Sequence, residues 1–141
     1  MFVKEIMNKK VFTINPQSSL RDAINIMCDN NIGSLVVTKN NKVRGIITER
    51  DVMKCVAQGT IEHADEIKIS SVMTHYIYFV KPEDKVEKAI EIIRKYKIKK
   101  LPVLDNSERL VGIITTTDIV FIQPKIIEKL SELISKDITN L

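Results

Sequence analysis

Two pairs of polar residues follow apolar segments at the same spacing, and their chemistry suits recognition of a sugar or a phosphate. Thr48 and Asp51 end the segment Gly-Ile-Ile-Thr-Glu-Arg-Asp, and Thr115 and Asp118 end the segment Gly-Ile-Ile-Thr-Thr-Thr-Asp. A threonine hydroxyl can donate a hydrogen bond to a phosphate or sugar oxygen, and a carboxylate can accept two hydrogen bonds from neighbouring ribose hydroxyls. The spacing therefore favours binding of a polyol or phosphate ligand.

The same residues also suit a structural role. A threonine before a helix caps its first turn, and an acid three residues later interacts favourably with the helix dipole. The N-terminus of a helix also presents unpaired N–H groups, which favour phosphate. Because the pair occurs twice at matched positions, helix capping and ligand binding both stay open, and the two roles can coexist.

Both segments belong to a repeat that runs through most of the chain. Residues of the first copy recur 66 positions later, and after one inserted residue the Gly-Ile-Ile-Thr segments recur at an offset of 67. The pairs at the first offset are Met7 and Met73, Pro16 and Pro82, Ala23 and Ala89, Ile24 and Ile90, Ile32 and Ile98, Leu35 and Leu101, and Val37 and Val103. Two copies in 141 residues predict a module with a pseudo-twofold axis.

Each copy predicts the same order of elements, which is a helical lead-in followed by β-α-β-β-α. The first copy predicts a lead-in helix over 3–7, a strand over 12–14, a helix started by Ser18, Ser19 and Asp22, strands over 35–38 and 43–48, and a helix after Thr48. The second predicts a lead-in helix over 69–73, a strand over 78–80, a helix capped by Asp84 and Glu87, strands over 101–104 and 110–115, and a helix after Thr115. Apolar spacing predicts one buried stripe on each long helix, made of Leu20, Ala23, Ile24 and Met27 or of Val86, Ala89, Ile90 and Ile93.

The predicted fold class is α+β, with two β-α-β-β-α repeats related by a pseudo-twofold axis and an extra C-terminal helix. Residues 1–67 are the first repeat with its linker over 58–68, residues 68–123 are the second repeat, and residues 124–141 are the C-terminal helix. The apolar stripe of that helix is Ile126, Ile127, Leu130, Leu133 and Ile134. We expect Met7, Met27, Met53 and Met73 in the core.

Size and composition fit one soluble globular unit. The 141 residues are 44% hydrophobic and 28% charged, and the net charge of +4 permits nucleic-acid contact without requiring it. Cys28 and Cys55 form no disulfide framework, which favours a reduced compartment. The chain starts without a secretory signal and has no apolar run near the roughly 20 residues of a membrane helix. We therefore expect a cytoplasmic protein, or the soluble part of a larger assembly, with no membrane contact.

The repeated pattern resembles a known family. The β-α-β-β-α order, the proline after each first strand, Leu-Pro-Val at 101–103 and the doubled Gly-Ile-Ile-Thr-x-x-Asp element are similar to tandem CBS motifs, which pair as a Bateman module. The resemblance covers residues 1–122 and implies a stand-alone CBS pair. Such pairs bind adenosyl compounds, which are AMP, ADP, ATP, S-adenosylmethionine and their relatives, in clefts between the repeats, and they regulate a partner. The resemblance also implies a disc-shaped homodimer.

The resemblance assigns roles to matching positions. Asp51 and Asp118 would hold ribose, and Thr48 and Thr115 would touch ribose or phosphate. Residues near Thr13-Ile14 and Phe79-Val80 would sandwich the purine, while Gly33-Ser34 and Lys99-Lys100 would line the clefts. Arg50 and Thr117, which differ between the copies, complete the expected ligand-binding set. We expect the cleft with Lys99 and Lys100 to prefer phosphorylated ligands, unless Arg50 supplies the phosphate contact in the other cleft.

Other functions find less support in the sequence. No nucleophile–base pair, metal quartet or Gly-rich phosphate loop suggests an enzyme, and we expect neither a catalytic cofactor nor a metal, since His63 and His75 lack further ligands at metal spacing. One alternative is a nucleic-acid-binding protein that uses the basic run Arg94, Lys95, Lys97, Lys99 and Lys100. The other is a purely structural dimerisation module. The ligand, the regulated partner and the sign of regulation stay open.

Overall fold

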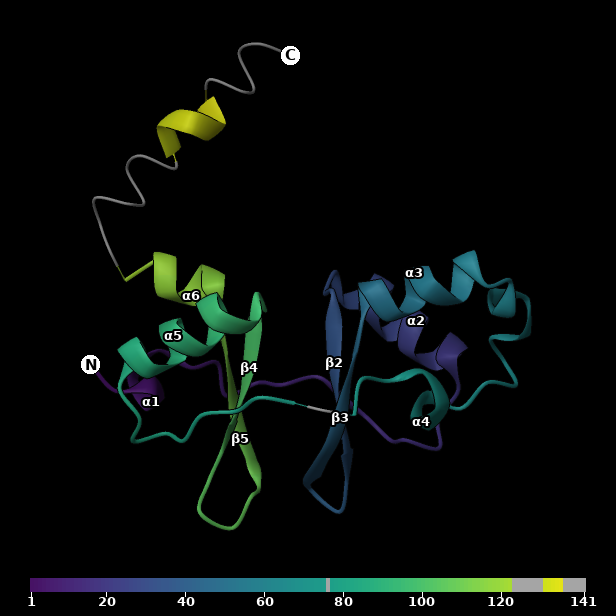
Figure 1. Ribbon diagram of the computed structural model, residues 1–141, viewed down its shortest axis with the longest axis horizontal. Helices are drawn as coiled ribbons and strands as arrows, with labels where there is room; N and C mark the ends of the chain where they lie inside the picture. The colour runs from purple at the N-terminus through teal and green to yellow at the C-terminus, as the bar shows by residue number, and fades with distance from the viewer. Residues whose placement is uncertain (76, 123–130, 136–141) are drawn as a thin grey trace.

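Two units of strands and helices, one from each copy of the repeat, stand side by side with their sheets at the centre (Figure 1). The structure is a computed structural model that describes residues 1–75, 77–122 and 131–135. The first unit contains β1 (Thr13–Ile14), α2 (Leu20–Asn30), β2 (Ser34–Lys39), β3 (Lys42–Thr48) and α3 (Glu49–Ala57). The second contains α5 (Val86–Tyr96), β4 (Lys100–Leu104), β5 (Leu110–Thr115) and α6 (Thr116–Val120). The α+β class and the paired repeats are confirmed.

The two sheets differ at the first strand of each copy. In the first unit β1 pairs parallel with β2, and β2 pairs antiparallel with β3. In the second unit β4 pairs antiparallel with β5, and the strand expected over 78–80 is reduced to one parallel bridge between Val80 and Val103. The N–H of Val36 donates to Phe12 in the first unit, whereas the equivalent Pro102 has no N–H to donate. The prediction of a strand over 78–80 was therefore wrong.

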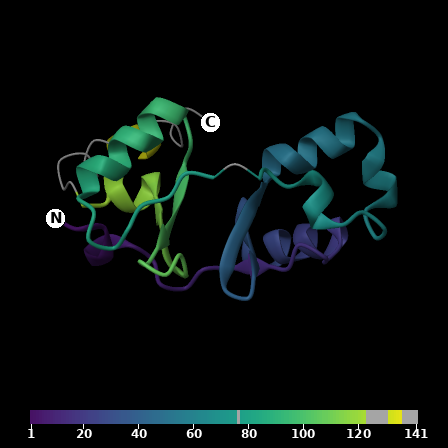
Figure 2. The same cartoon turned by 60° about the horizontal axis from the view of Figure 1, so that its bottom comes forward.

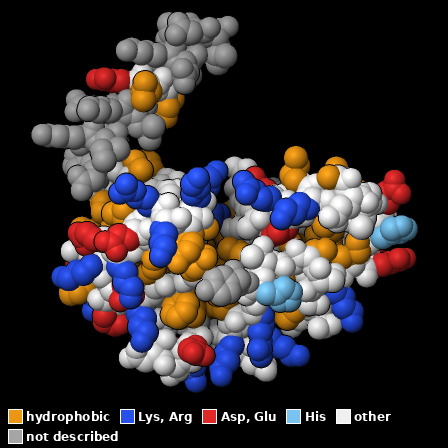
Figure 3. All heavy atoms as spheres, in the orientation of Figure 1, with side chains coloured by type: hydrophobic (Ala, Val, Ile, Leu, Met, Phe, Trp, Pro, Cys, Tyr) orange, Lys and Arg blue, Asp and Glu red, His pale blue; other side chains and the backbone are white. Residues whose placement is uncertain are grey.

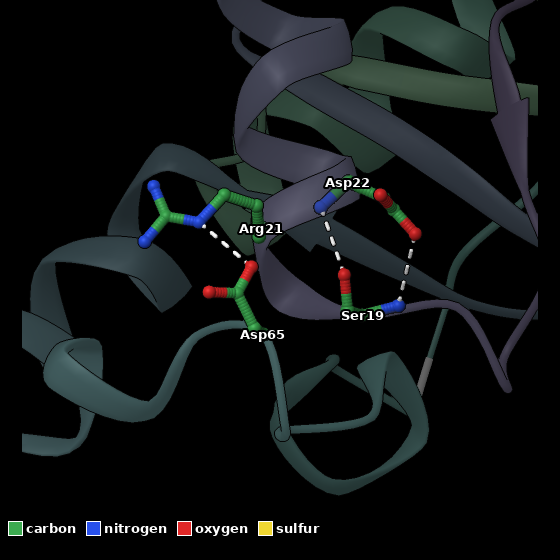
Figure 4. Close-up of polar contacts among 4 residues, drawn as sticks. All are labelled: Ser19, Arg21, Asp22 and Asp65. Carbon is green, nitrogen blue, oxygen red and sulfur yellow. Dashed lines mark hydrogen bonds and ion pairs between the residues drawn. The ribbon is translucent and has the colours of Figure 1, made fainter.

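The two long helices begin differently. The Ser19 hydroxyl accepts from the N–H of Asp22 at 3.1 Å and the Asp22 carboxylate accepts from the N–H of Ser19 at 3.4 Å, as predicted (Figure 4). The predicted pair of Asp84 and Glu87 does not cap α5. Lys85 is the N-cap residue, without a side-chain cap, and the carboxylate of Asp84 instead accepts from the N–H of Lys81 at 2.8 Å. Asp84 lies one residue too early, so it closes the preceding turn.

Each unit has its own apolar core, although two residues predicted to be buried lie at the surface. Leu20, Ala23 and Met27 of α2 and Val86 and Ala89 of α5 are buried. Ile90, expected on the buried stripe of α5, is 41% exposed, and Met53 on α3 is 67% exposed. Neither residue belongs to the apolar core of its unit, whereas Ile24, which matches Ile90 in the first copy, packs against its core.

The lead-in helices are exchanged between the units. The helix α1 (Val3–Ile6) packs on the second unit, where Val3 is fully buried and its N–H donates to Asp84 at 2.8 Å. The helix α4 (Ile69–Val72) packs on the first unit, where the N–H of Ile69 donates to Ser18 at 2.9 Å. The crossing N-terminal segment is visible in Figure 2. This exchange ties the two units together and places a connecting segment beside each sheet.

The remaining segments add little to the site. The linker predicted over 58–68 contains a short 3₁₀ helix, η1 (Thr60–His63). Of the predicted C-terminal helix, residues 131–135 are helical and the rest lies outside the described residues. Among the described residues, no helix has the length and apolar character needed to cross a membrane.

Candidate functional site

Both Thr-x-x-Asp elements lie where a strand passes directly into a helix. Thr48 ends β3 and caps α3, with its N–H donating to the Asp51 carboxylate at 2.9 Å and its hydroxyl accepting from the N–H of Asp51 at 3.3 Å. Thr115 and Asp118 repeat these two bonds at 3.0 and 3.1 Å at the start of α6. The capping role is therefore present in both copies, and each pair uses one carboxylate oxygen, Oδ2, for it.

The two carboxylates differ in what else they bind. Asp51 is 8% exposed and also accepts from the hydroxyls of Thr48 at 3.0 Å and Thr74 at 3.2 Å. At the position equivalent to Thr74 the first copy has Asn8, whose side-chain oxygen accepts from the N–H of Lys10 instead. Asp118 is partly exposed, and its Oδ1 has no further donor among the described residues. Asp118 is thus the carboxylate with a free oxygen for a ligand.

A cleft between the two units opens beside Thr115. It encloses about 160 Å³ and receives residues from both units and from the exchanged lead-in segment. Its lining residues are Asn8, Lys10, Val11, Phe12, Ile32, Ser34, Val36, Lys100, Ile113 and Thr115. The strand register explains part of this set, because Lys100 pairs with Thr115 and Ser34 pairs with Thr48. Three of the predicted site residues, Ser34, Lys100 and Thr115, therefore meet in one cleft.

The lead-in segment supplies cleft residues that the sequence did not reveal. Asn8, Lys10 and Phe12 precede β1, whereas the resemblance pointed to Thr13 and Ile14. The exchange of α1 between units carries this segment to the cleft, since Asn8 bridges to Ile113 of β5. No local pattern signals such an exchange. One sequence hint is the basic pair Lys9-Lys10, two residues before the first strand.

The other predicted residues lie outside this cleft. Ile14 and Val80 are buried in the two separate cores at 6% and 1% exposure. Thr13, Lys99, Arg50 and Thr117 are exposed, the last two on the first turns of α3 and α6. Phe79 lines a second depression between the β-hairpins. Within the ranges that the structure describes, no cluster of His, Cys, Asp or Glu could hold a metal ion.

Charge at the cleft comes from Lys10, Lys100 and Glu49. Burial lowers the pKa of the half-buried Lys100 ammonium, and the nearby Glu49 carboxylate opposes that shift. The side chain of Glu49 lies against Gly33, where an added Cβ would stand 2.6 Å from its Oε1. Glycine at position 33 therefore leaves room for this carboxylate next to Ser34. The cleft offers two ammonium groups, with one carboxylate near Lys100.

Sequence profiles identify the family. A profile of the CBS domain matches residues 3–58 and again residues 69–125. The chain belongs to the CBS-domain family. The predicted tandem arrangement is confirmed, and the chain is a CBS pair, which is a regulatory module.

Relatives of this CBS pair include an enzyme and several CBS proteins. Inosine-5'-monophosphate dehydrogenase of Thermoplasma acidophilum is 36% identical over 115 residues, which cover 82% of this chain and only 22% of that enzyme. The CBS domain pair of protein MJ0100, solved in complex with 5-methylthioadenosine and S-adenosyl-L-methionine, is 31% identical with a TM-score of 0.75, over 84% of this chain and 96% of that one. The CBS-domain protein ATU1752 of Agrobacterium tumefaciens is 31% identical with a TM-score of 0.76, over 85% of this chain and 97% of that one.

Proposed function

We propose that this CBS pair binds an adenosyl compound, either an adenine nucleotide or a metabolite such as S-adenosylmethionine, in the cleft beside Thr115. The observation that carries the proposal is the free Oδ1 of Asp118, whose Oδ2 is hydrogen-bonded to Thr115. Thr115 lines the cleft together with Lys10 and Lys100, while Asp118 itself lies one hydrogen bond behind the lining. A carboxylate with a free oxygen can accept from vicinal ribose hydroxyls. The similarity to a CBS pair solved with two adenosyl compounds supports this ligand class.

The chemistry of the lining suggests how such a ligand would be held. The ribose hydroxyls would donate to Asp118, and the apolar side chains of Val11, Phe12 and Ile113 would contact the base. A phosphate would face the ammonium groups of Lys10 and Lys100. The cleft volume of about 160 Å³ is below the roughly 300–1,000 Å³ typical of ligand pockets, so part of a nucleotide would extend past the rim.

Ligand binding at this cleft would bridge the two units. Ser34 and Val36 come from the first unit, and Lys100, Ile113 and Thr115 come from the second. A ligand that contacts both units binds more tightly to the arrangement of the units that brings its contacts together. It shifts the protein toward that arrangement by as much as its affinities for the two arrangements differ. We assign the module a regulatory role toward a protein partner on this basis. A cytoplasmic location, where adenine nucleotides are made and used, belongs to the same proposal.

The structure also favours self-association. α3 and α6 lie at the same end of the molecule, opposite the hairpin turns (Figure 1), and Met53, Val56 and Phe121 are exposed there by 67%, 52% and 59%. Single exposed apolar residues are ordinary, but several large ones at the same end of a molecule are typical of an interface. Closed twofold pairing is the commonest arrangement of homo-oligomers, so we assign this edge to a homodimer.

A thermal-unfolding panel tests the ligand class. AMP, ADP, ATP, S-adenosylmethionine and 5-methylthioadenosine are added separately, with GMP as the matched control for the base. A true ligand at about 100 times its Kd stabilises the folded chain by about 2.7 kcal/mol. We expect at least one adenosyl compound to raise the Tm more than GMP. If none raises it even at millimolar concentration, the proposal fails and the structural dimerisation alternative is favoured.

One observation supports a different function. Arg94, Lys95, Lys97 and Lys99 are all exposed around the C-terminal end of α5 and the turn after it. A nucleic-acid partner held by these residues would lose affinity steeply with salt, with a slope that follows the number of phosphates neutralised. Salt titration of single-stranded and double-stranded oligonucleotide binding measures this directly. An adenosyl ligand held by Asp118 would show a much weaker salt dependence.

A further inference from the structure

A second depression, the hairpin groove, lies between the two β-hairpins at the end of the sheets away from the Thr-x-x-Asp elements. Its lining residues are Lys42, Val43, Arg44, Ile77, Phe79, Leu104 and Glu108. The hairpins touch one another beside it, through a bridge between Lys42 and Arg109. Thr48 lies at the opposite end of β3 from Lys42, about 20 Å away for six steps along an extended strand. The groove also shares no lining residue with the cleft beside Thr115, so the two are separate.

The groove combines an aromatic surface with two cations. The ring of Phe79 is 43% exposed, Ile77 beside it is partly buried, and Leu104 is 6% exposed. Figure 3, in the orientation of Figure 1, shows lysine and arginine side chains along the lower edge, where the hairpin turns lie, and hydrophobic side chains above them. The volume of about 390 Å³ falls within the roughly 300–1,000 Å³ of small-molecule sites. An apolar lining with a few charged groups is the usual composition of such sites.

The position of Arg44 depends on a β-bulge. Val37 pairs with Gly45 and Thr38 pairs with Val43, so Arg44 is the extra residue on its strand. A bulge redirects the side chain of the extra residue and is common beside binding sites. The second unit keeps the same bulge between Val103 and Leu104, where the extra residue is Val111. The fold supplies the bulge in both units, but only one bulge carries a cation.

The aromatic residue of the groove, Phe79, is likewise present in only one of the two copies. Phe79 corresponds to Thr13 and Ile77 to Val11 at the offset of 66 that relates the copies. The pseudo-symmetric face of the other unit therefore has no ring at position 13 and has Val111 in place of Arg44, although Arg109 there matches Lys42. The hairpin groove is a feature of this chain's side chains and does not follow from the CBS fold itself.

We propose that the hairpin groove binds a small aromatic anion. The ring of the ligand packs against Phe79 and Ile77, and its carboxylate, sulfonate or phosphate group lies between Lys42 and Arg44. A guanidinium forms paired hydrogen bonds with such an anion. Glu108, the one acid in the lining, accepts a hydrogen bond from an N–H or O–H on the ligand ring and disfavours ligands with a second negative group on that side. This site is independent of adenosyl binding beside Thr115.

Fluorescence titration of the full chain with anilinonaphthalene sulfonate, an aromatic anion, tests the proposal. Phe79→Ala and Arg44→Gln each remove one part of the site. Phe2→Ala and Arg94→Gln are the matched controls, because they remove an exposed aromatic and an exposed arginine elsewhere. We expect each groove variant to weaken binding by about tenfold, the loss typical of one charge-assisted bond or one ring contact, and each control to leave the Kd within about twofold.

Chemical-shift mapping of backbone amides supplies the second readout. The probe should shift amides of residues 42–44, 77 and 104, and saturating AMP should not displace it. The proposal is overturned if the groove variants keep wild-type affinity, if the shifted amides lie on α3 and α6, or if AMP competes with the probe. A failure of AMP to bind at all would count against the adenosyl proposal and leave this result unaffected.

Discussion

Asp51 and Asp118 have the same motif around them and yet differ in their hydrogen bonds. Asp51 accepts from the hydroxyls of Thr48 and Thr74 in addition to the N–H of Thr48, and it is buried. Asp118 accepts from the N–H of Thr115 and keeps one oxygen free. A single residue, Thr74 in place of Asn8, accounts for part of this difference. The first carboxylate therefore stabilises the fold more, and the second is better placed for a ligand.

The substitutions Asp51→Asn and Asp118→Asn separate these roles in stability. Asp51→Asn should lower the free energy of unfolding by about 1.5–3 kcal/mol, because a buried charged acceptor with several donors is replaced by a neutral amide. Asp118→Asn should cost less than about 1 kcal/mol, since the asparagine side-chain oxygen can still accept from the N–H of Thr115 at this partly exposed helix start. Urea unfolding of both variants measures the difference. Equal losses would contradict the distinction between the two carboxylates.

Lys100 is expected to bind phosphate at a cost in stability. Burial lowers the pKa of its ammonium in the folded chain, so the unfolded chain holds this proton more tightly. The penalty is complete at neutral pH and is relieved as the pH rises through the lowered pKa toward the usual value of 10.5. Lys100→Met should therefore raise the free energy of unfolding at pH 7 and reduce its increase with pH in the alkaline range.

Calorimetry completes the Lys100 test. Lys100→Met should weaken the binding of AMP and ATP and leave the binding of adenosine unchanged, because adenosine has no phosphate. Lys99→Met, at the exposed neighbouring position, is the matched control and should change neither the nucleotide affinity nor the free energy of unfolding by more than a small amount. Equal weakening of adenosine and AMP would show that Lys100 acts through the shape of the cleft and would contradict its role as a phosphate contact.

At the scale of elements, the repeat predicted the order of strands and helices and the capped strand–helix junctions. The repeat could not predict the exchange of α1 and α4, because this depends on how the two units meet. The strand expected over 78–80 does not form, because Pro102 lacks the N–H that would have paired with it. Asp84 does not cap α5, because it lies one residue before the N-cap position, which Lys85 occupies. Of the cleft, Ser34, Lys100 and Thr115 were predicted, and Asn8, Lys10 and Phe12 were missed.

The exchanged segments approach the sheets closely at two glycines. A Cβ added at Gly45 would stand 2.5 Å from the backbone oxygen of Thr74, and one added at Gly112 would stand 2.6 Å from the thioether of Met7. Backbone cannot move aside as a methionine side chain can. Gly45→Ala should therefore lower the free energy of unfolding by about 1–3 kcal/mol, and Gly112→Ala should cost less. Thermal unfolding that ranks them in the opposite order would contradict the close approach of this segment.

At the scale of the whole molecule, the exposed apolar edge on α3 and α6 should mediate dimerisation. Light scattering of the wild-type chain at micromolar concentration should give about twice the protomer mass of 16.1 kDa. Met53→Glu should give the mass of one protomer, because a charge buried in a dimer interface lacks a partner. Phe79→Ser, which alters an exposed apolar residue of the hairpin groove, is the control and should stay dimeric. A wild-type protomer mass of 16.1 kDa would contradict this role.

Calorimetric titration of AMP and of S-adenosylmethionine into the wild-type chain, Asp118→Asn and Asp51→Asn tests the adenosyl site most directly. At least one compound should bind, and Asp118→Asn should weaken that binding by about 1.5–3 kcal/mol. The 2′-deoxy form of that ligand should bind the wild type more weakly than the ribose form does. Asp118→Asn should bind the two forms with nearly equal affinity, because it already lacks the hydrogen bond to the 2′-hydroxyl. Asp51→Asn, measured where it is still folded, should bind nearly as the wild type. Unchanged affinity in Asp118→Asn together with a clear loss in Asp51→Asn would contradict an adenosyl site at Asp118.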